Sequence, residues 1–223
     1  MPPVCELTLR DACRLLPCAN PARGVLEAVA APEDLVLMLE LESWTNDRVS
    51  AEAGTLYRLP AQEWVRNRPL ADLINAAFCY PAAESGRFNG VERSAWHAAT
   101  SVTAAHAEAV YFRAAELAEI GVSDTRVEMR LYLADFRGAF HDIRAGLPGH
   151  APYHDPISHR ASQRLARQLL AGGSNGVIYR SVRHPGAECV ACFRPGLVAN
   201  VRAGACYEYR WAGRCTARIR RLG

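Results

Sequence analysis

The sequence contains no lysine, so all 26 of its basic side chains are arginines. Genome base composition explains such a bias without any function, although arginine also suits the bidentate recognition of phosphates. The formal net charge is only +3, which is too small to indicate nucleic-acid binding. With 50% hydrophobic and 22% charged residues among 223, the chain is expected to be globular, with one sizeable core and one or two domains.

Long apolar runs are also missing. Charges at Glu6, Arg10, Asp11 and Arg14 interrupt the beginning of the chain, which excludes the apolar region of a secretory signal peptide. No later stretch is long and apolar enough to cross a bilayer. We therefore expect a soluble cytoplasmic protein with no membrane partner, whose eight cysteines are mostly reduced thiols.

Metal-binding patterns are incomplete. The pair Cys189-x-x-Cys192 suggests zinc, with Cys206 and Cys215 as further ligands, but a four-cysteine site usually needs a second close pair. In a strand, positions i and i+3 also point to opposite faces. Buried, unreactive cysteines are therefore the preferred interpretation, and no metal site is predicted.

Nucleotide and nucleophile signatures are absent as well: there is no G-x-G-x-x-G, no Walker loop and no G-x-S-x-G elbow. The spacing His150-x-x-x-His154 fits metal binding on a helix, but Pro152 lies between the two histidines. We expect a loop there, over 146–156, in which the histidines form local hydrogen bonds.

Periodicity predicts an α+β protein: a compact mixed or antiparallel sheet core with flanking helices. Helical patterns cover 25–42, part of 66–87, 101–119 and 158–170, the last with Ser158 as a possible cap. Strand patterns cover 55–59, 94–99 and 126–134, and two hairpins are expected, 177–179 with 189–193 and 206–211 with 216–219. The expected division is an N-terminal helical extension, 1–48, packed on a single globular unit, 49–223.

Glu108 is the first anomaly. Steps of three and four residues from it reach Ala104, Ala105, Tyr111 and Phe112, so the carboxylate projects from the apolar face of its helix. A buried carboxylate without a partner is costly. Glu108 is therefore either functional or part of an ion pair at the edge of the core.

Three further residues have both a structural and a functional interpretation. Arg58 in the strand TLYRL either faces solvent or binds an anion, and Arg87 lies in the loop SGRFNG, an ordinary turn or a close approach to a ligand. Ser181 lies near the turn of the first hairpin, where a serine commonly satisfies backbone groups. Together with Glu108 they offer arginines for a phosphate, a sheltered carboxylate and a hydroxyl.

These residues lie in stretches that resemble the RES-domain family, named for an arginine, a glutamate and a serine. The resemblance runs from about residue 25 to residue 220. Its best stretches are 41–48 (LESWTNDR), Tyr57-Arg58, 86–89 (GRFN), Ala107-Glu108, Ser162-Gln163 and 179–195 (YRSVRHPGAECVACFRP). On this match the naming residues are Arg58, Glu108 and Ser181.

The resemblance implies a toxin of a toxin–antitoxin pair that consumes NAD as its substrate and needs no other cofactor. It cleaves the nicotinamide–ribose bond with phosphate or water as acceptor, on a fold similar to that of ADP-ribosyltransferases. The implied partner is a helix-turn-helix antitoxin that covers the active site, and nucleic acid is contacted only through that antitoxin.

The resemblance also implies residue roles. Glu108, Arg58 and Ser181 are the expected catalytic residues, and Tyr57, Arg58, Arg87 and Ser181 are expected to bind NAD. Trp96 and His97 are also expected to bind NAD, as an aromatic clamp. Family members often place tyrosines at these two positions, so the clamp departs from the family pattern.

Two other functions also fit the sequence. The first keeps the fold but transfers ADP-ribose to a protein. The second is a non-enzymatic nucleic-acid binder built on the tail 207–221, where arginines and aromatic residues alternate. Against the second stand the low net charge and a simpler interpretation, in which the tail is a hairpin with a solvated arginine face.

Overall fold

A computed structural model describes residues 1–18, 59–79, 86–89, 93–144, 148–213 and 216–223. The described α-helices are α4 (Ala71–Cys79), α5 (Val102–Glu119) and α6 (Arg160–Ala171), with short 3-10 helices η2 (Ala61–Glu63), η3 (Pro148–His154) and η4 (Pro195–Leu197). The described strands are β1 (Val4–Pro17), β2 (Trp96–Ala99), β3 (Asp124–Asp142), β4 (Gly176–Arg180), β5 (Glu188–Cys192), β6 (Ala199–Ala212) and β7 (Arg218–Arg221).

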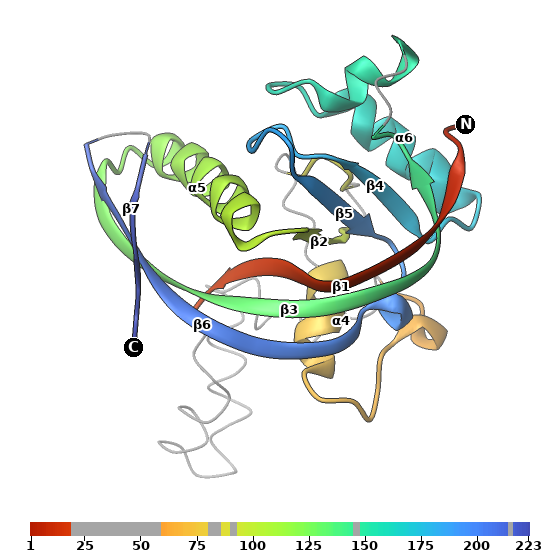
Figure 1. Ribbon diagram of the computed structural model, residues 1–223, viewed down its shortest axis with the longest axis horizontal. Coiled ribbons are helices and arrows are strands. Elements are labelled where there is room, and N and C mark those ends of the chain that lie inside the picture. Colours follow the sequence, from red (N-terminus) through yellow and green to blue (C-terminus); the bar gives the residue numbers. More distant parts are fainter. Residues whose placement is uncertain (19–58, 80–85, 90–92, 145–147, 214–215) are drawn as a thin grey trace.

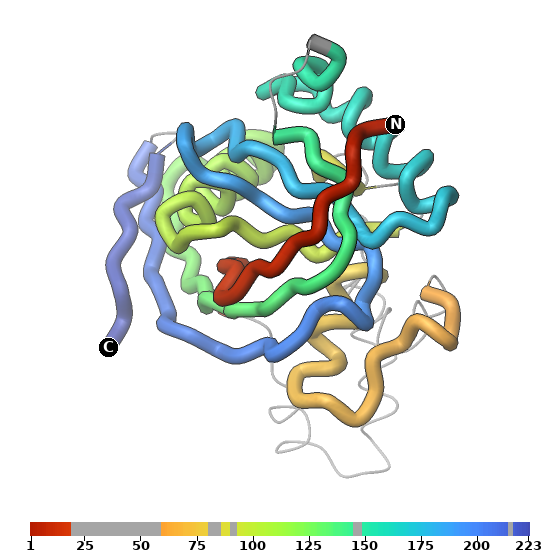
Figure 2. The backbone as a smooth tube through the Cα atoms, turned by 45° about the vertical axis from the view of Figure 1, so that its right-hand side comes forward, coloured from red at the N-terminus to blue at the C-terminus, as the bar shows by residue number. Residues whose placement is uncertain are grey.

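The described strands form one seven-stranded mixed sheet in the order β1-β2-β5-β4-β3-β6-β7, which confirms the sheet core with flanking helices. Only β3 and β4 pair in parallel; the other pairs are antiparallel. Because β1 also pairs with β3, the first five strands of this order close into a ring, visible around the centre of Figure 2. The long strands β1, β3 and β6 curve together beneath α5 (Figure 1).

The first strand corrects the expected helical extension, since residues 4–17 belong to the central sheet rather than to a helix. Leu7 faces one core. The alternation of inward and outward side chains is then interrupted by a bulge between Leu9 and Ala12, where Asp11 has a φ of 57°. The extra residue reverses the inward and outward positions, so neither half shows a long alternating pattern. The expected helix 25–42, the strand 55–59 and the boundary at 48/49 lie outside the described residues.

Most other elements confirm the sequence prediction. Helix α5 covers the expected 101–119, and the Ser101 side chain accepts a hydrogen bond from the Ala104 N–H at its start. Both predicted hairpins form, as β4–β5 and β6–β7. Two details differ. His159 rather than Ser158 occupies the N-cap position of α6, without a capping hydrogen bond from its side chain, and the expected loop 146–156 contains η3. The Ser158 N–H donates to the Asp155 carboxylate, so this segment turns before the helix starts.

The two larger of the three hydrophobic cores among the described residues lie on opposite faces of the sheet. One packs against α4 and includes Phe78, Trp96 and Phe140, all at most 1% exposed. The other packs against α5 and α6 and includes Phe88 and Tyr179. No helix of the described residues combines the length and the apolar character that a membrane crossing requires.

Gly176, the first residue of β4, is expected to tolerate no side chain. Its φ is +148°, and an added Cβ would lie 2.2 Å from the Ala191 carbonyl oxygen. Backbone strain and overpacking together predict that Gly176→Ala lowers the free energy of unfolding by about 3 kcal/mol. Gly186 has a φ of +85° but open space around it, so Gly186→Ala measures the backbone strain alone. It should lower the free energy of unfolding by about 1 kcal/mol. Denaturant unfolding of both variants tests this, and equal losses would contradict the close contact.

Candidate active site

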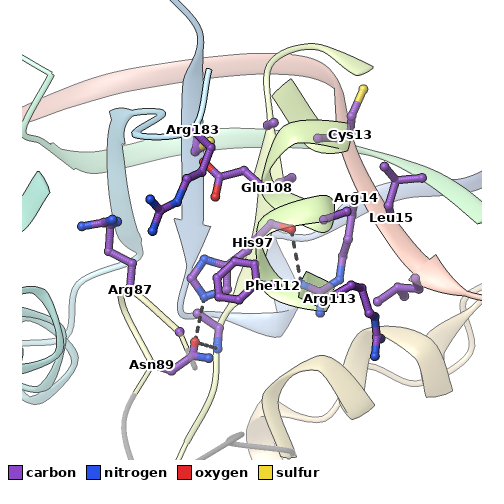
Figure 3. Close-up of a pocket in the computed structure, with 18 of the residues that line it drawn as sticks. Cys13, Arg14, Leu15, Arg87, Asn89, His97, Glu108, Phe112, Arg113 and Arg183 are labelled. Atoms are coloured by element: carbon purple, nitrogen blue, oxygen red, sulfur yellow. Dashed lines mark hydrogen bonds between the residues drawn. The ribbon is translucent and has the colours of Figure 1, made fainter. Parts of the chain in front are cut away.

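A cleft of about 280 Å³ opens between α5, the end of β1 and the strands β2 and β5. Figure 3 shows that its walls come from segments far apart in the sequence. The side chains with chemical groups on this cleft include Arg14, Arg87, Asn89, His97, Glu108, Arg113, Glu116, His159, Arg183 and Cys189. Four arginines thus surround one cleft in which Glu108 lies half-buried.

Glu108 is held by the first hairpin. The Ser181 hydroxyl donates a hydrogen bond of 2.8 Å to Glu108 Oε1, across 73 residues of sequence. The Cys189 thiol lies 3.9 Å from the same oxygen. Both contacts engage Oε1, which fixes the carboxylate while the other oxygen has no hydrogen bond from the described residues. The structural interpretation of Glu108 as part of an ion pair does not hold within the described residues.

Ser181 satisfies backbone groups of its turn, as a serine in such a position commonly does, in addition to its contact with Glu108. Its side-chain oxygen accepts hydrogen bonds from the N–H groups of Arg183, at 3.2 Å, and His184, at 3.0 Å. Its own N–H donates to the Ala187 carbonyl at 2.9 Å, which closes the turn. With two N–H groups donating to it, the hydroxyl directs its proton toward Glu108. The polar end of the β4–β5 hairpin is therefore hydrogen-bonded to the Glu108 carboxylate through Ser181.

Arg87 is a buried arginine, 6% exposed, that lines the cleft. Its Nη1 donates to the carbonyls of Tyr153, at 2.9 Å, and Asp155, at 2.8 Å. Gln163 Nε2 donates to the Gly86 carbonyl and anchors the loop. Burial lowers the pKa of Arg87 from its usual value. Among the described residues, the Arg87 guanidinium contacts carbonyl oxygens but forms no ion pair. A buried charge of this kind favours an anionic ligand.

His97 faces the same cleft as a neutral ring. Burial, together with the nearby charge of Arg14, lowers the pKa of His97 to about 3. His97 Nε2 lies 2.7 Å from Asn89 Oδ1, which also accepts a hydrogen bond from the Ala95 N–H. Because this oxygen is an acceptor, Nε2 carries the ring proton and Nδ1 remains an acceptor. His97 can therefore accept a hydrogen bond from a ligand but supplies no charge.

Trp96 does not reach the cleft, which corrects its expected place beside His97. The two are neighbours on β2, and neighbouring strand residues point to opposite faces. Trp96 is fully buried in the core against α4. An aromatic clamp from Trp96 is thus excluded by its burial. Tyr57 and Arg58 lie outside the described residues.

Arg14 and Arg113 are cleft arginines that carried no signal in the sequence, whereas Arg183 lies in the stretch 179–195 on which the family resemblance rests. Arg183 lies over the Tyr111 ring and donates to the Pro156 carbonyl, and Arg14 reaches the cleft from β1. Helical or strand periodicity does not distinguish such residues from solvated arginines. Only the pairing of β1 with β3 and β2 brings Arg14 to the site.

A sequence model of the family described as "RES domain" matches residues 55–212, well over half of the chain. The chain belongs to the RES-domain family. The matched segment of this RES protein includes Glu108, Arg87 and Ser181, whereas β1 precedes it. The match is shorter at both ends than the resemblance read from the sequence.

The RES protein is also similar to an uncharacterized protein, y4oC, of Sinorhizobium fredii (strain NBRC 101917 / NGR234). The two are 29% identical over 209 residues, which cover 93% of this chain and 86% of that protein. The similarity therefore extends beyond the matched RES segment into the flanking residues of this chain.

The remaining sequence hypotheses also have structural outcomes in the RES protein. Cys189 and Cys192 lie in the two different cores, on opposite faces of β5, as strand geometry predicts. His154 Nδ1 lies 3.1 Å from the His150 carbonyl, a local contact of the kind expected. Tyr209 and Trp211 of the tail are at most 1% exposed, so these two rings offer no stacking surface to nucleic acid. The arginines of β7 are exposed, which agrees with a solvated hairpin face.

Proposed function

We propose that this RES protein consumes NAD by cleaving its nicotinamide–ribose bond. The observation that carries the proposal is the hydrogen bond from Ser181 to Glu108 inside a cleft lined by arginines. This combination offers a fixed carboxylate for a developing cation and guanidinium groups for a diphosphate. Membership of the RES-domain family supports the same assignment.

The chemistry requires an anion beside the ribose. Departure of nicotinamide leaves positive charge on the sugar, as in glycoside cleavage. In the proposed mechanism the carboxylate of Glu108, held through Oε1, stabilises that charge and leaves its second oxygen for the ribose hydroxyls. A carboxylate that is already oriented needs no reorganisation as the charge develops.

The other residues bind and orient the dinucleotide. Arg87, together with Arg58, is proposed to bind the pyrophosphate through planar hydrogen bonds. Ser181 holds Glu108 and the wall of the site, and Nδ1 of His97 accepts a hydrogen bond from the ligand. Tyr57, which precedes Arg58 in the sequence, is proposed to contact the nucleotide.

In the cell, we propose that the protein is a cytoplasmic toxin of a toxin–antitoxin pair on an ADP-ribosyltransferase-like fold. Its antitoxin, a helix-turn-helix protein, would neutralise it by covering Glu108, Ser181 and Arg58. An acidic segment of the antitoxin suits an arginine-lined cleft, because it would imitate the phosphates of the ligand. Contact with nucleic acid would then be made by the antitoxin.

The direct test is incubation of purified protein with NAD, with and without inorganic phosphate, followed by mass spectrometry of the products. We expect free nicotinamide in either case, with ADP-ribose from water or ADP-ribose phosphate from phosphate as the second product. ADP-ribose attached to a protein would instead indicate transfer to a side chain. Intact NAD after prolonged incubation with folded protein would reject the proposed reaction.

A further inference from the structure

Arg14 is a charged residue of the cleft that no carboxylate of the described residues neutralises. It lies on β1, lines the cleft, and takes part in no ion pair within the described residues. Arg113, in the same cleft, is by contrast paired with Glu116 at 2.6 Å. Burial lowers the pKa of Arg14 to about 10, so the side chain is still charged at neutral pH.

The described residues use few of the hydrogen-bonding groups of Arg14. Nη1 donates one long hydrogen bond of 3.3 Å to the His97 carbonyl, and Nε is buried with no partner among the described residues. The guanidinium carbon lies 4.8 Å from the centre of the Trp96 ring, which supports one face of the group. The two Nη atoms together carry four N–H donors, of which the described residues use one, so the other three are left for a ligand.

A buried charge without a counter-ion is unfavourable unless something else supplies the opposite charge. Glu63 shows how the same chain neutralises other arginines, because it pairs with both Arg93, through two hydrogen bonds, and Arg194. No carboxylate of the described residues does the same for Arg14. Figure 3 shows Arg14 across the cleft from Arg87, with His97 between them. A second anion-binding position, separate from that of Arg87, fits this arrangement.

We infer that Arg14 binds a phosphate group in the cleft. It is contributed by a strand that precedes the segment matched by the RES family model. The phosphate would come either from the pyrophosphate of the dinucleotide or from a free phosphate ion that acts as acceptor. The choice between these sources rests on the proposed function, whereas the anion site itself does not.

The first test measures anion binding without turnover. Inorganic pyrophosphate and inorganic phosphate are titrated calorimetrically into wild type, Arg14→Met, Arg14→Lys and Arg10→Met. Arg14→Met keeps an unbranched stem over Trp96 but removes the charged hydrogen bonds, so affinity for at least one anion should fall about tenfold or more. Arg14→Lys keeps the charge but lacks the planar guanidinium, so its anion affinity should lie between those of wild type and Arg14→Met. Arg10 is exposed on the same strand, so Arg10→Met should bind like wild type.

Wild-type affinity for both anions in a folded Arg14→Met protein would overturn the inference. If Arg14→Met does not fold, wild-type affinity in Arg14→Lys would overturn it equally. The absence of measurable binding of either anion to wild type would also reject the site.

The second test identifies the source of the phosphate from NAD cleavage by Arg14→Lys. A raised KM for NAD assigns the group to the dinucleotide, and a raised half-saturating phosphate concentration with unchanged KM for NAD assigns it to the acceptor. A lower kcat with an unchanged KM for NAD and an unchanged half-saturating phosphate concentration would indicate a positioning role and overturn the inference. Anion binding that depends on Arg14 in a protein that leaves NAD intact would keep the site and reject the proposed reaction.

Discussion

Glu108→Gln is expected to lower the rate of NAD cleavage by about a hundredfold or more while the fold is kept. Glutamine preserves the size of the side chain and can still accept the hydrogen bond from Ser181, but it removes the negative charge that opposes the ribose cation. The measurement is nicotinamide release at saturating NAD, together with thermal unfolding to show that the variant is folded.

Two companion variants sharpen this prediction. Glu116→Gln removes a carboxylate on the same helix and the same cleft, but one that is half exposed and paired with Arg113, so its rate should stay close to wild type. Ser181→Ala keeps the negative charge of Glu108 and removes only the hydrogen bond that orients it. Its rate of NAD cleavage should therefore lie between those of wild type and Glu108→Gln. Near-normal turnover by folded Glu108→Gln would eliminate the electrostatic role of this carboxylate.

Unrestrained expression of the wild-type chain is expected to deplete the cellular NAD pool and stop growth. The reason is that water and phosphate are abundant acceptors, so nothing but the enzyme and NAD limits the proposed reaction. Intracellular NAD and growth are measured together after induction, with Glu108→Gln as the matched inactive protein. Co-expression of a partner that covers Glu108 and Ser181 should restore both.

The informative contradiction is growth arrest with an unchanged NAD pool. That result would point to modification of a protein target instead of depletion. Western blotting of both proteins at equal amounts provides the control for expression, since a poorly produced variant would also be harmless.

Local signals made most of the elements predictable. Helix α5 follows from its Ser101 cap and its many helix-forming residues, and β4–β5 follows from two apolar runs around a turn. The contact between Glu108 and Ser181 could not be derived from spacing, because 73 residues separate them. The family resemblance placed both residues in one site, and their hydrogen bond is a finding of the structure.

The faces of short strands were harder to predict. In β2 both Trp96 and His97 have apolar neighbours, so a four-residue alternation does not indicate which side chain faces the cleft. In β1 the bulge near Asp11 disrupts the alternation of apolar and polar residues, and several charged residues make the segment look unlike a strand. Arg14 was therefore unpredictable: its role depends on the sheet that forms around it rather than on its neighbours in sequence.

The pairing of β1 with β3 also has a consequence for synthesis of the chain. Val4 pairs with His141 and Pro17 with Met129, so the first strand leaves the ribosome long before its partner exists. Such distant pairings carry a high loop-closure entropy and are associated with slow folding. An unfinished chain therefore lacks both the Arg14 wall and the hairpin that carries Ser181. The cleft can be completed only after most of the polypeptide has been made, which delays any activity until translation is nearly finished.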